Sequence, residues 1–579
     1  MRALSLSRLQ VLGLMILAAT LPFELKAPLV SFGPIAITNV EAILYLVIML
    51  WLISTLYRRQ WHWSIVHSAV LVWLGVQFCA AVFAPLERAA ALKFALRSAG
   101  GAWLFFIAAA WIRTSRRAAW IMAAIALGAV LSALAGWLEV GSSAAQTALL
   151  IFKTQATLVG DQLRASGTFQ YANTAAMYWE ATWPILIAAG ARWSIARGQR
   201  RWLGLALIGG LIGGEAIILS SSRAALVSAA LALGIMIVSD RVVDRAGHIR
   251  SGLRRPAVLS LIGLVVLIGV QLFVNPLFTA RLRSEGDASW FQAVVRSDQA
   301  HLTAFAGETL TQTIGVTNTS VRTWPAAGVQ AVHVSYHWIQ PGTRRVLILD
   351  GARTALPHDL APGKSVTVSA VVDVPAVTGT LLLQWDMVQE DVTWFGERGS
   401  PVAEVKVNVT PAPQVVKAEP LPVSSALQEV APPSRAALWR AGWQMWLNYP
   451  LLGVGPDNFR HVYGPYLGQM KFDDRLTANS WIVEVLATTG LIGLLASGLV
   501  LMAMVLVLRR YWHSLANRDA RLLAVGLSVA LLAFLMHGLV DYFMEFTPTY
   551  GLFWLIAGTL VSLLTGTHDV ELASPVDRV

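Results

Sequence analysis

The arginine best placed to bind an anion is Arg223, which follows three serines in the segment LSSSRAAL. This polar turn separates two long apolar stretches, where an arginine is costly unless it has a partner. A guanidinium group pairs with phosphate through two parallel hydrogen bonds. The alternative is a structural salt bridge, for which Glu215, two turns earlier, is a candidate. Glu180 is another carboxylate within an apolar stretch, and the sequence leaves both kinds of role open for these groups.

A second polar loop could also bind an anionic head group. It reads DQLRASGTFQYANTAAMYW and places Arg164, Gly167, Thr168 and Asn173 just before an apolar stretch. Polar side chains at this position suit a ligand at a membrane surface. The alternative is an ordinary interfacial loop, whose arginine extends to lipid phosphates while its stem stays in apolar surroundings.

Most of the other candidates lie in residues 435–493. Arg435 and Arg440 occur in an amphipathic run whose tryptophans suit a helix in the membrane interface: Trp439, Trp443 and Trp446. The turn LLGVGPDNF follows and matches neither nucleotide-binding glycine motif. The remaining polar candidates are His461, Asp473, Asp474, Arg475 and Asn479. Neither these residues nor the more distant His537, Asp541 and Glu545 have a convincing metal-ligand spacing, so we expect no metal site and no cofactor.

The composition identifies the elements that must position these residues. The chain is 56% hydrophobic and only 13% charged, whereas a soluble protein is about 25% charged. The apolar residues form blocks of roughly 20, the length that crosses a bilayer core of about 30 Å. We therefore expect an all-α polytopic membrane protein with about twelve transmembrane helices, at residues 9–23, 37–57, 65–84, 97–112, 118–138, 174–191, 202–219, 223–239, 257–275, 481–507, 521–541 and 550–566.

The arginines predict the orientation of these helices. The net charge of +11 comes from arginines in short loops between apolar blocks, where they mark the cytoplasmic side, so it does not indicate a nucleic-acid partner. These loops share one side if both termini are cytoplasmic. The loop at residues 141–173, the turn before Arg223 and the long connection at residues 276–479 then face the outside. The single cysteine, Cys79, excludes an intrachain disulfide.

Residues 305–411 differ from the rest because short alternating segments such as SVTVSAVVDV and AEVKVNV are separated by turn residues. This pattern predicts an inserted extracytoplasmic β-sandwich domain. Its tryptophans could stack on sugar rings, although sandwich core is the commoner role: Trp324, Trp338, Trp385 and Trp394. The predicted domains are a membrane domain (1–275), a connector (276–304), the sandwich (305–411), a proline-rich linker (412–434), an outer loop with an interfacial helix (435–480), C-terminal membrane helices (481–566) and a cytoplasmic tail (567–579).

In this order, the polar segments resemble the O-antigen ligase and O-antigen polymerase family of bacterial inner-membrane proteins. The matching segments are RASGTFQYANTAA, SSSRAAL, RAALWRAGWQMWLNYPLLGVGPDNF, ANSWIVEVLATTGLIGLL and HGLVDYFMEF. The resemblance implies a fold like that of the GT-C glycosyltransferases and covers most of the chain outside the β domain. The β domain itself is similar to immunoglobulin-like domains of bacterial surface enzymes.

The resemblance also implies a reaction. A glycan would move from an undecaprenyl-diphosphate carrier to an acceptor hydroxyl on a glycan or lipid-linked glycan, without a metal. The family's two diphosphate-binding arginines correspond to Arg223 and Arg435, with Arg164, Arg440 and Arg475 as further candidates. Fixed cations would stabilise the charge that develops on the leaving diphosphate.

The sequence departs from the family pattern where a base is expected. The family's His-Asn pair corresponds to Asn479-Ser480, and no histidine occurs between Val462 and Phe534. Asparagine can orient a hydroxyl but cannot accept its proton. The catalytic candidates are therefore Asn479, His461, Asp473 and Asp474.

Two other functions remain open. The protein could be a catalytically inactive family member that binds glycan or assists the assembly of surface polysaccharide through its β domain. A transporter is the third hypothesis, because Glu180 and Glu215 lie within apolar stretches, but the sequence has no internal repeat to support it.

Overall fold

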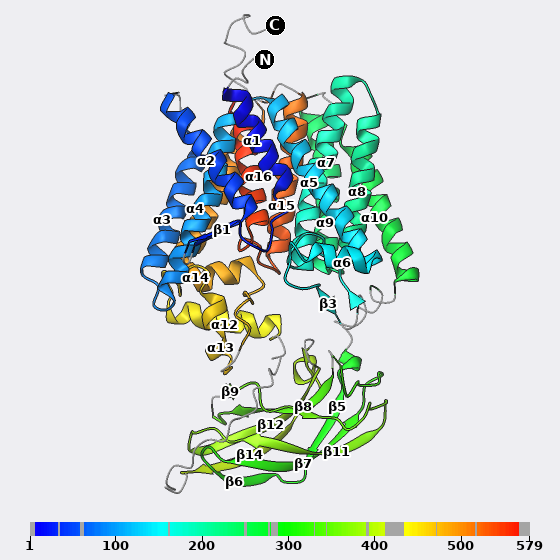
Figure 1. The fold of residues 1–579 in the computed structure, drawn as a ribbon, viewed down its shortest axis with the longest axis vertical. Helices are drawn as coiled ribbons and strands as arrows, with labels where there is room; N and C mark the ends of the chain where they lie inside the picture. The colour runs from blue at the N-terminus through cyan, green and yellow to red at the C-terminus, as the bar shows by residue number, and fades with distance from the viewer. Residues whose placement is uncertain are drawn as a thin grey trace, which may run out of the picture.

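Helices form the two apolar parts of the chain and strands form the part between them (Figure 1). The computed structural model describes residues 6–32, 35–57, 63–159, 162–247, 252–275, 278, 288–328, 331–342, 344, 346–389, 393–411, 433–469, 472–513, 515 and 518–566. The predicted linker and cytoplasmic tail, and most of the predicted connector, lie outside these residues.

Each of the twelve predicted spans falls on a helix. The helices are α1 (Leu6–Thr20), α2 (Asn39–Tyr57), α3 (Ile65–Val82), α4 (Arg88–Trp111), α5 (Ser115–Gly141), α7 (Ala172–Arg197), α8 (Arg201–Leu219), α9 (Arg223–Gly247), α10 (Arg254–Val274), α14 (Trp481–Trp512), α15 (Arg518–Gly538) and α16 (Thr547–Gly566). In the described part of the chain, eight are long and apolar enough to cross a membrane: α3, α4, α5, α8, α10, α14, α15 and α16. Shorter apolar helices lie in α1, α2 and α9, so a count of twelve spans stays a prediction.

The interior of the bundle is built around α7, α15 and α16. Helix α16 is buried along nearly its whole length, and α7 is buried from Thr174 to Ile185. Close approach depends on small residues, as in other membrane helices. On α8, Gly210 and Gly214 leave room for the Trp183 ring, because a Cβ atom at either position would lie 2.4 or 2.7 Å from it.

Helix α14 is broken at Gly490, whose φ of 65° and ψ of −166° are not helical. The segment at residues 450–455 satisfies the backbone groups around this break. The Val454 N–H donates to the Ala487 carbonyl at 2.9 Å, and the Leu491 N–H donates to the Pro450 carbonyl at 2.9 Å. Irregular backbone within a membrane helix is tolerated where protein supplies such partners. The glycine-rich turn LLGVGP and its neighbour Pro450 therefore supply hydrogen-bond partners for the backbone groups at the break in α14.

The strands of the inserted region form two sheets around one hydrophobic core. The larger sheet contains β6 (His301–Phe305), β8 (Val332–Ile339), β9 (Val346–Ile348), β10 (Thr354–Ala355), β12 (Gly379–Gln389), β13 (Thr393–Trp394) and β14 (Ala403–Thr410). The smaller contains β5 (Ala293–Ser297), β7 (Thr309–Asn318) and β11 (Ser365–Asp373). Short turns η1 (Ala288–Trp290) and η2 (Gly396–Arg398) flank these strands.

This β region starts earlier than the predicted boundary at residue 305. Strand β5 pairs with β7, and β6 pairs in parallel with β14, more than 100 residues away in the sequence. Short strands whose partners are so distant give little local signal, and the predicted boundary was therefore too late. Trp324, Trp338 and Trp385 belong to the hydrophobic core between the sheets, and Trp394 is buried beside Val388 in a separate cluster, so all four are at most 2% exposed. The immunoglobulin-like character of the region stays a prediction.

Two helices lie between the bundle and the β region: α12 (Arg435–Asn448) and α13 (Phe459–Tyr466) (Figure 1). Helix α1 begins and α16 ends at the opposite end of the bundle (Figure 1). The short elements β1 (Val30–Phe32), β2 (Ile35–Ile37), α6 (Ser143–Leu149), β3 (Leu158–Val159) and β4 (Gln162–Leu163) connect the helices on the side near α12. The candidate polar segments thus gather at one end of the bundle.

Candidate functional site

The serine turn before Arg223 is fixed by its own side chains. Helix α8 ends at Leu219, and α9 begins at Arg223. The Ser220 hydroxyl donates to the Ile217 carbonyl at 2.6 Å and accepts from the Ser222 N–H at 3.3 Å. Ser221 has a φ of 54° and is buried. This tight turn presents Arg223, which is partly buried, at the first position of α9.

Arg164 connects the loop before α7 to the serine turn before α9. Its Nε donates to the Ser220 carbonyl at 2.7 Å, and its Nη2 donates to Asn173 Oδ1 at 2.7 Å. The Ala165 N–H also bonds to the Leu219 carbonyl at 3.1 Å. Arg164 is 8% exposed, so its guanidinium group is held by protein and does not extend to lipid. The loop before α7 and the serine turn consequently form one unit.

A buried ion pair holds this loop from the other side. Glu139, at the end of α5, accepts hydrogen bonds from the N–H groups of Ser166 and Gly167 at 2.9 and 2.7 Å. Lys153 bonds to Glu139 and donates to Ser166 Oγ at 2.7 Å. Both charged residues are fully buried. Sequence reasoning missed the pair, although a lone carboxylate at the end of an apolar helix was a usable signal.

Asp541 is a carboxylate that is linked to Arg164 through Asn173. It follows the end of α15, and its Oδ2 accepts a hydrogen bond from Asn173 Nδ2 at 2.9 Å. Burial raises the pKa of Asp541, while the positive charges of Arg435 and Arg164 and the Asn173 bond lower it. Asn173 thus bridges Arg164 and Asp541, which are more than 370 residues apart in the sequence.

Arg435 completes the cluster from α12. The Ser434 hydroxyl caps this helix by accepting from the Ala437 N–H at 3.3 Å. Arg435 is exposed, and its charge acts on Asp541 and on Arg223. Arg223 also experiences the charge of Arg398, from the β region. We call Arg164, Arg223, Arg435, Arg398 and Asp541 the arginine site.

Two carboxylates within the bundle have structural partners. Glu180 Oε1 and His537 Nδ1 form a hydrogen bond of 3.0 Å, and both side chains are completely buried. Glu215 bonds to the Gln271 amide of α10, so the described contacts do not support the proposed Glu215–Arg223 salt bridge. Glu215, on α8, can reach Gln271 because α8 and α10 lie side by side. Arg223 is the first residue of α9, which has less contact with α8.

In the described contacts, Arg475, Asp473 and His461 interact with residues other than Arg223, Arg435 and Asp541. Arg475 binds Asp473 through two hydrogen bonds of 2.7 and 2.9 Å, so each of these groups has the other as its partner. Asp474 is exposed. His461 lies on α13 close enough to influence the Asp457 carboxylate.

The sequence predicted neither the backbone conformation of Asn479 nor the position of Arg440 near the β region. Asn479 has a φ of 49°, a conformation that asparagine tolerates better than most residues. Its carbonyl accepts from Trp439 Nε1 at 3.4 Å, just before α14 begins. Arg440 is exposed on α12, and its charge acts on Glu397 of the β region. Their assigned roles stay predictions.

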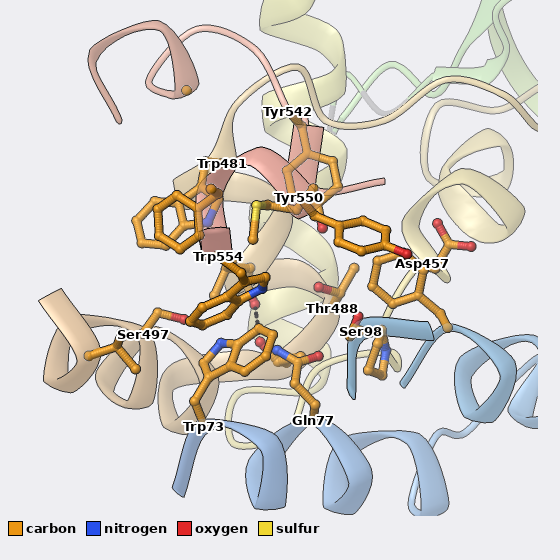
Figure 2. A pocket seen from close by; sticks show the side chains of 18 of the residues that line it. Trp73, Gln77, Ser98, Asp457, Trp481, Thr488, Ser497, Tyr542, Tyr550 and Trp554 are labelled. Atoms are coloured by element: carbon orange, nitrogen blue, oxygen red, sulfur yellow. Dashed lines mark hydrogen bonds between the residues drawn. The ribbon is translucent and has the colours of Figure 1, made fainter. Parts of the chain in front are cut away.

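The helix bundle also contains an apolar groove (Figure 2). The groove lies between α3, α4, α14, α15 and α16 and has a volume of about 890 Å³, part of which is open to solvent. Figure 2 shows Trp481, Trp73 and Trp554 around it, with Asp457 and Thr488 on the other side. Tyr542 lines the groove and is the neighbour of Asp541 in the sequence. A lining of this kind suits an apolar chain that ends in a polar group.

Across the described residues, no group of three or more His, Cys, Asp or Glu side chains is placed to hold a metal ion. The guanidinium groups of the arginine site can donate charge-assisted hydrogen bonds, which suit an anion such as a phosphate.

Comparison with known proteins adds one finding. No curated protein sequence matches the chain significantly. A family model described as O-antigen ligase matches residues 392–498, which include α12, α13 and the first part of α14. Arg435 and the segment that packs on the α14 break lie within the match. Residues 392–498 are therefore similar to the O-antigen ligase family.

Proposed function

We propose that this protein transfers a glycan from undecaprenyl diphosphate to an acceptor hydroxyl on the outer face of the bacterial cytoplasmic membrane. The observation that carries the proposal is the convergence of Arg164, Arg223 and Arg435. They come from a loop, a turn and a helix that are far apart in the sequence, and Arg223 and Arg435 influence each other electrostatically. Asp541 supplies one negative charge to this cluster of cations, and an anionic ligand would balance the remaining positive charge.

The diphosphate would bind to Arg223 and Arg435. Arg164 would hold the serine turn in place, because it donates to the Ser220 carbonyl at 2.7 Å. As the bond between the anomeric carbon and the phosphate oxygen breaks, negative charge grows on the diphosphate. Cations already fixed at that position stabilise the transition state more than the ground state.

Asp541 is the group that we assign as the general base. The acceptor hydroxyl oxygen forms the new bond to the anomeric carbon and gives its proton to the Asp541 carboxylate. Burial raises the pKa of this carboxyl group, and a carboxylate with a raised pKa accepts a proton more readily. Asn173 fixes its orientation through the 2.9 Å hydrogen bond.

The groove in Figure 2 supports a lipid-linked substrate. Its aromatic lining could hold an isoprenoid chain, and one lining residue, Tyr542, directly follows Asp541 in the sequence. We also propose that both termini are cytoplasmic, because the arginine-rich short loops then lie on the cytoplasmic side of the membrane.

The test is to replace the gene in the bacterium with genes that encode the variants Arg223→Ala, Arg435→Ala or Asp541→Asn. The amount of surface glycan is then measured on gels. We expect each arginine variant to reduce glycan transfer at least about 100-fold, the effect of losing one fixed group at developing charge. Arg296→Ala, at an exposed position of β5, is the control. Normal glycan in both arginine variants, at normal protein level, would contradict the proposal.

A further inference from the structure

The β region is docked on the α12–α13 segment through specific contacts. The Leu349 N–H donates to the Gly468 carbonyl at 3.3 Å, and Gln469 Nε2 donates to Asp350 Oδ2 at 2.7 Å. Leu349 packs in the hydrophobic cluster that contains Leu438 and Tyr463. Gly468 has a φ of 72°, and a Cβ atom there would lie 2.9 Å from the Leu347 carbonyl oxygen. The position of the β region relative to α12 is therefore fixed by these contacts.

A second contact involves the turn η2 of the β region. The Glu397 side chain lies beside the Ser434 hydroxyl, and it also experiences the charge of Arg440. The next residue, Arg398, influences Arg223 electrostatically. Its Nε donates to Thr393 Oγ1 at 3.2 Å, and its guanidinium lies 5.6 Å from the centre of the Phe291 ring. The β region consequently contributes one cation to the arginine site.

An open cleft of about 1510 Å³ lies between the β region and the α12–α13 segment. Polar side chains from both parts line it: Arg344, Glu397, Arg440, Gln444, Asn448 and Tyr466. Arg440, Gln444 and Asn448 follow one another at four-residue spacing, so they form one face of α12. Asn448 Nδ2 also donates to the Tyr466 hydroxyl at 3.3 Å.

The lining indicates the chemistry of the ligand. Amide, carboxylate and guanidinium groups offer both donors and acceptors for the closely spaced hydroxyl groups of a sugar chain. The cleft is not suited to a polyanion, because Arg344 is paired with Glu404 at 2.7 Å and Arg440 is near Glu397. The other half of the lining is apolar, with Leu349 and Leu447 among its residues, and sugar rings present apolar faces as well as hydroxyl groups. A hydroxyl-rich chain of low charge is the ligand that fits.

We propose that this cleft binds the glycan chain next to the reacting sugar, so that the β region and α12 form two sides of one sugar-binding site. The inference rests on the proposed function. Glu397 lines the cleft, Arg398 acts electrostatically on Arg223, and the two residues are adjacent in η2. A glycan whose terminal sugar reacts beside Arg223 would extend from the membrane surface into the cleft. The chain could belong to the donor or to the acceptor.

The experiment uses the full-length protein in nanodiscs and two probes. One is the sugar chain released from the bacterium's own surface polysaccharide by mild acid, and the other is undecaprenyl diphosphate without sugar. The variant is Gln444→Ala/Asn448→Ala, at two exposed positions. The matched control is Thr367→Ala, at an exposed position of the other sheet.

We expect the double variant to bind the sugar chain at least 10-fold more weakly and to bind undecaprenyl diphosphate as the wild type does. Arg223→Ala should show the reverse pattern. Unchanged sugar binding by the double variant would overturn the cleft proposal alone. Failure of the wild type to bind undecaprenyl diphosphate would overturn the proposed function instead.

Kinetics then identify the source of the chain. A rise in KM for the lipid-linked donor, with KM for the acceptor unchanged, assigns the cleft to the donor glycan, and the converse assigns it to the acceptor. Unchanged values of both constants would overturn the proposal. Tyr466→Phe is a second variant, which removes one hydroxyl group from the cleft and should weaken sugar binding about 3-fold.

Discussion

Arg164 Nε donates a hydrogen bond to the carbonyl oxygen of Ser220 at 2.7 Å. This bond joins a loop that precedes α7 to the turn that begins α9. A guanidinium group makes several hydrogen bonds in a fixed plane, and Arg164 uses a second one to hold Asn173. The position of Arg223 and the orientation of Asp541 both depend on this one side chain.

Arg164→Lys should therefore impair glycan transfer although the charge is retained. An ammonium group cannot reach Ser220 and Asn173 with the same planar geometry. Each hydrogen bond from a charged group contributes about 1.5–3 kcal/mol, so we expect a loss of about 10- to 100-fold in surface glycan. Wild-type transfer by this variant would show that charge alone is sufficient. Arg296→Lys is the matched control, because Arg296 is exposed on β5.

Gly490→Ala should destabilise the protein. A Cβ atom at Gly490 would lie 2.3 Å from the backbone of Leu451, and its φ of 65° is unfavourable for alanine. We expect a clear fall in the unfolding temperature in detergent, since the 450–455 segment must move away from α14. Gly498→Ala is the control on the same helix, because nothing lies within 4 Å of its Cβ position. Equal unfolding temperatures for the two variants would contradict this account of the helix break.

Glu139→Ala should reduce stability by about 3–5 kcal/mol, because it leaves the buried Lys153 ammonium without its counter-charge. It also removes the acceptor of the Ser166 and Gly167 N–H groups. The double variant Glu139→Gln/Lys153→Met keeps an acceptor and removes both charges, so it should recover more than half of the loss. Thermal unfolding of the three proteins is the measurement. A double variant less stable than Glu139→Ala would refute this interpretation.

The stability of the protein should fall between pH 4.5 and 7 because of Glu545. Burial, with a contribution from Asp457, raises its pKa from 4.5 to about 7, while Arg460 and Arg97 oppose the shift. Since the pKa is higher in the folded state, the stability linked to the protonated form is complete below the unfolded value. It is lost as the pH rises through about 7. The free energy involved is on the order of 3 kcal/mol at most.

Glu545→Gln tests this pH dependence. The variant cannot titrate at this position, so its unfolding temperature should change less than that of the wild type between pH 5 and pH 8. Arg460 keeps its other carboxylate partner, Asp457, in this variant. An identical slope in the two proteins would show that Glu545 does not titrate in this range.

The positions of the membrane helices followed from the sequence alone. Blocks of about 20 apolar residues have few alternatives to a helix in a membrane, because each backbone group must find a partner within its own segment. The sequence also identified the polar segments that meet in the arginine site, including Arg164, Asn173 and Arg223. These residues stand at the ends of apolar blocks, where polar side chains are visible against their surroundings.

Which polar groups are partners was decided only by the tertiary structure. Asn173 bonds to Asp541, His537 to Glu180, and Glu215 to Gln271. Each pair joins helices or loops at least 50 residues apart, so helical spacing carries no information about it. Arg398 lies near Arg223 because the β region docks on the α12–α13 segment. Apolar periodicity determines which segments become helices, whereas packing between distant segments determines which charges meet.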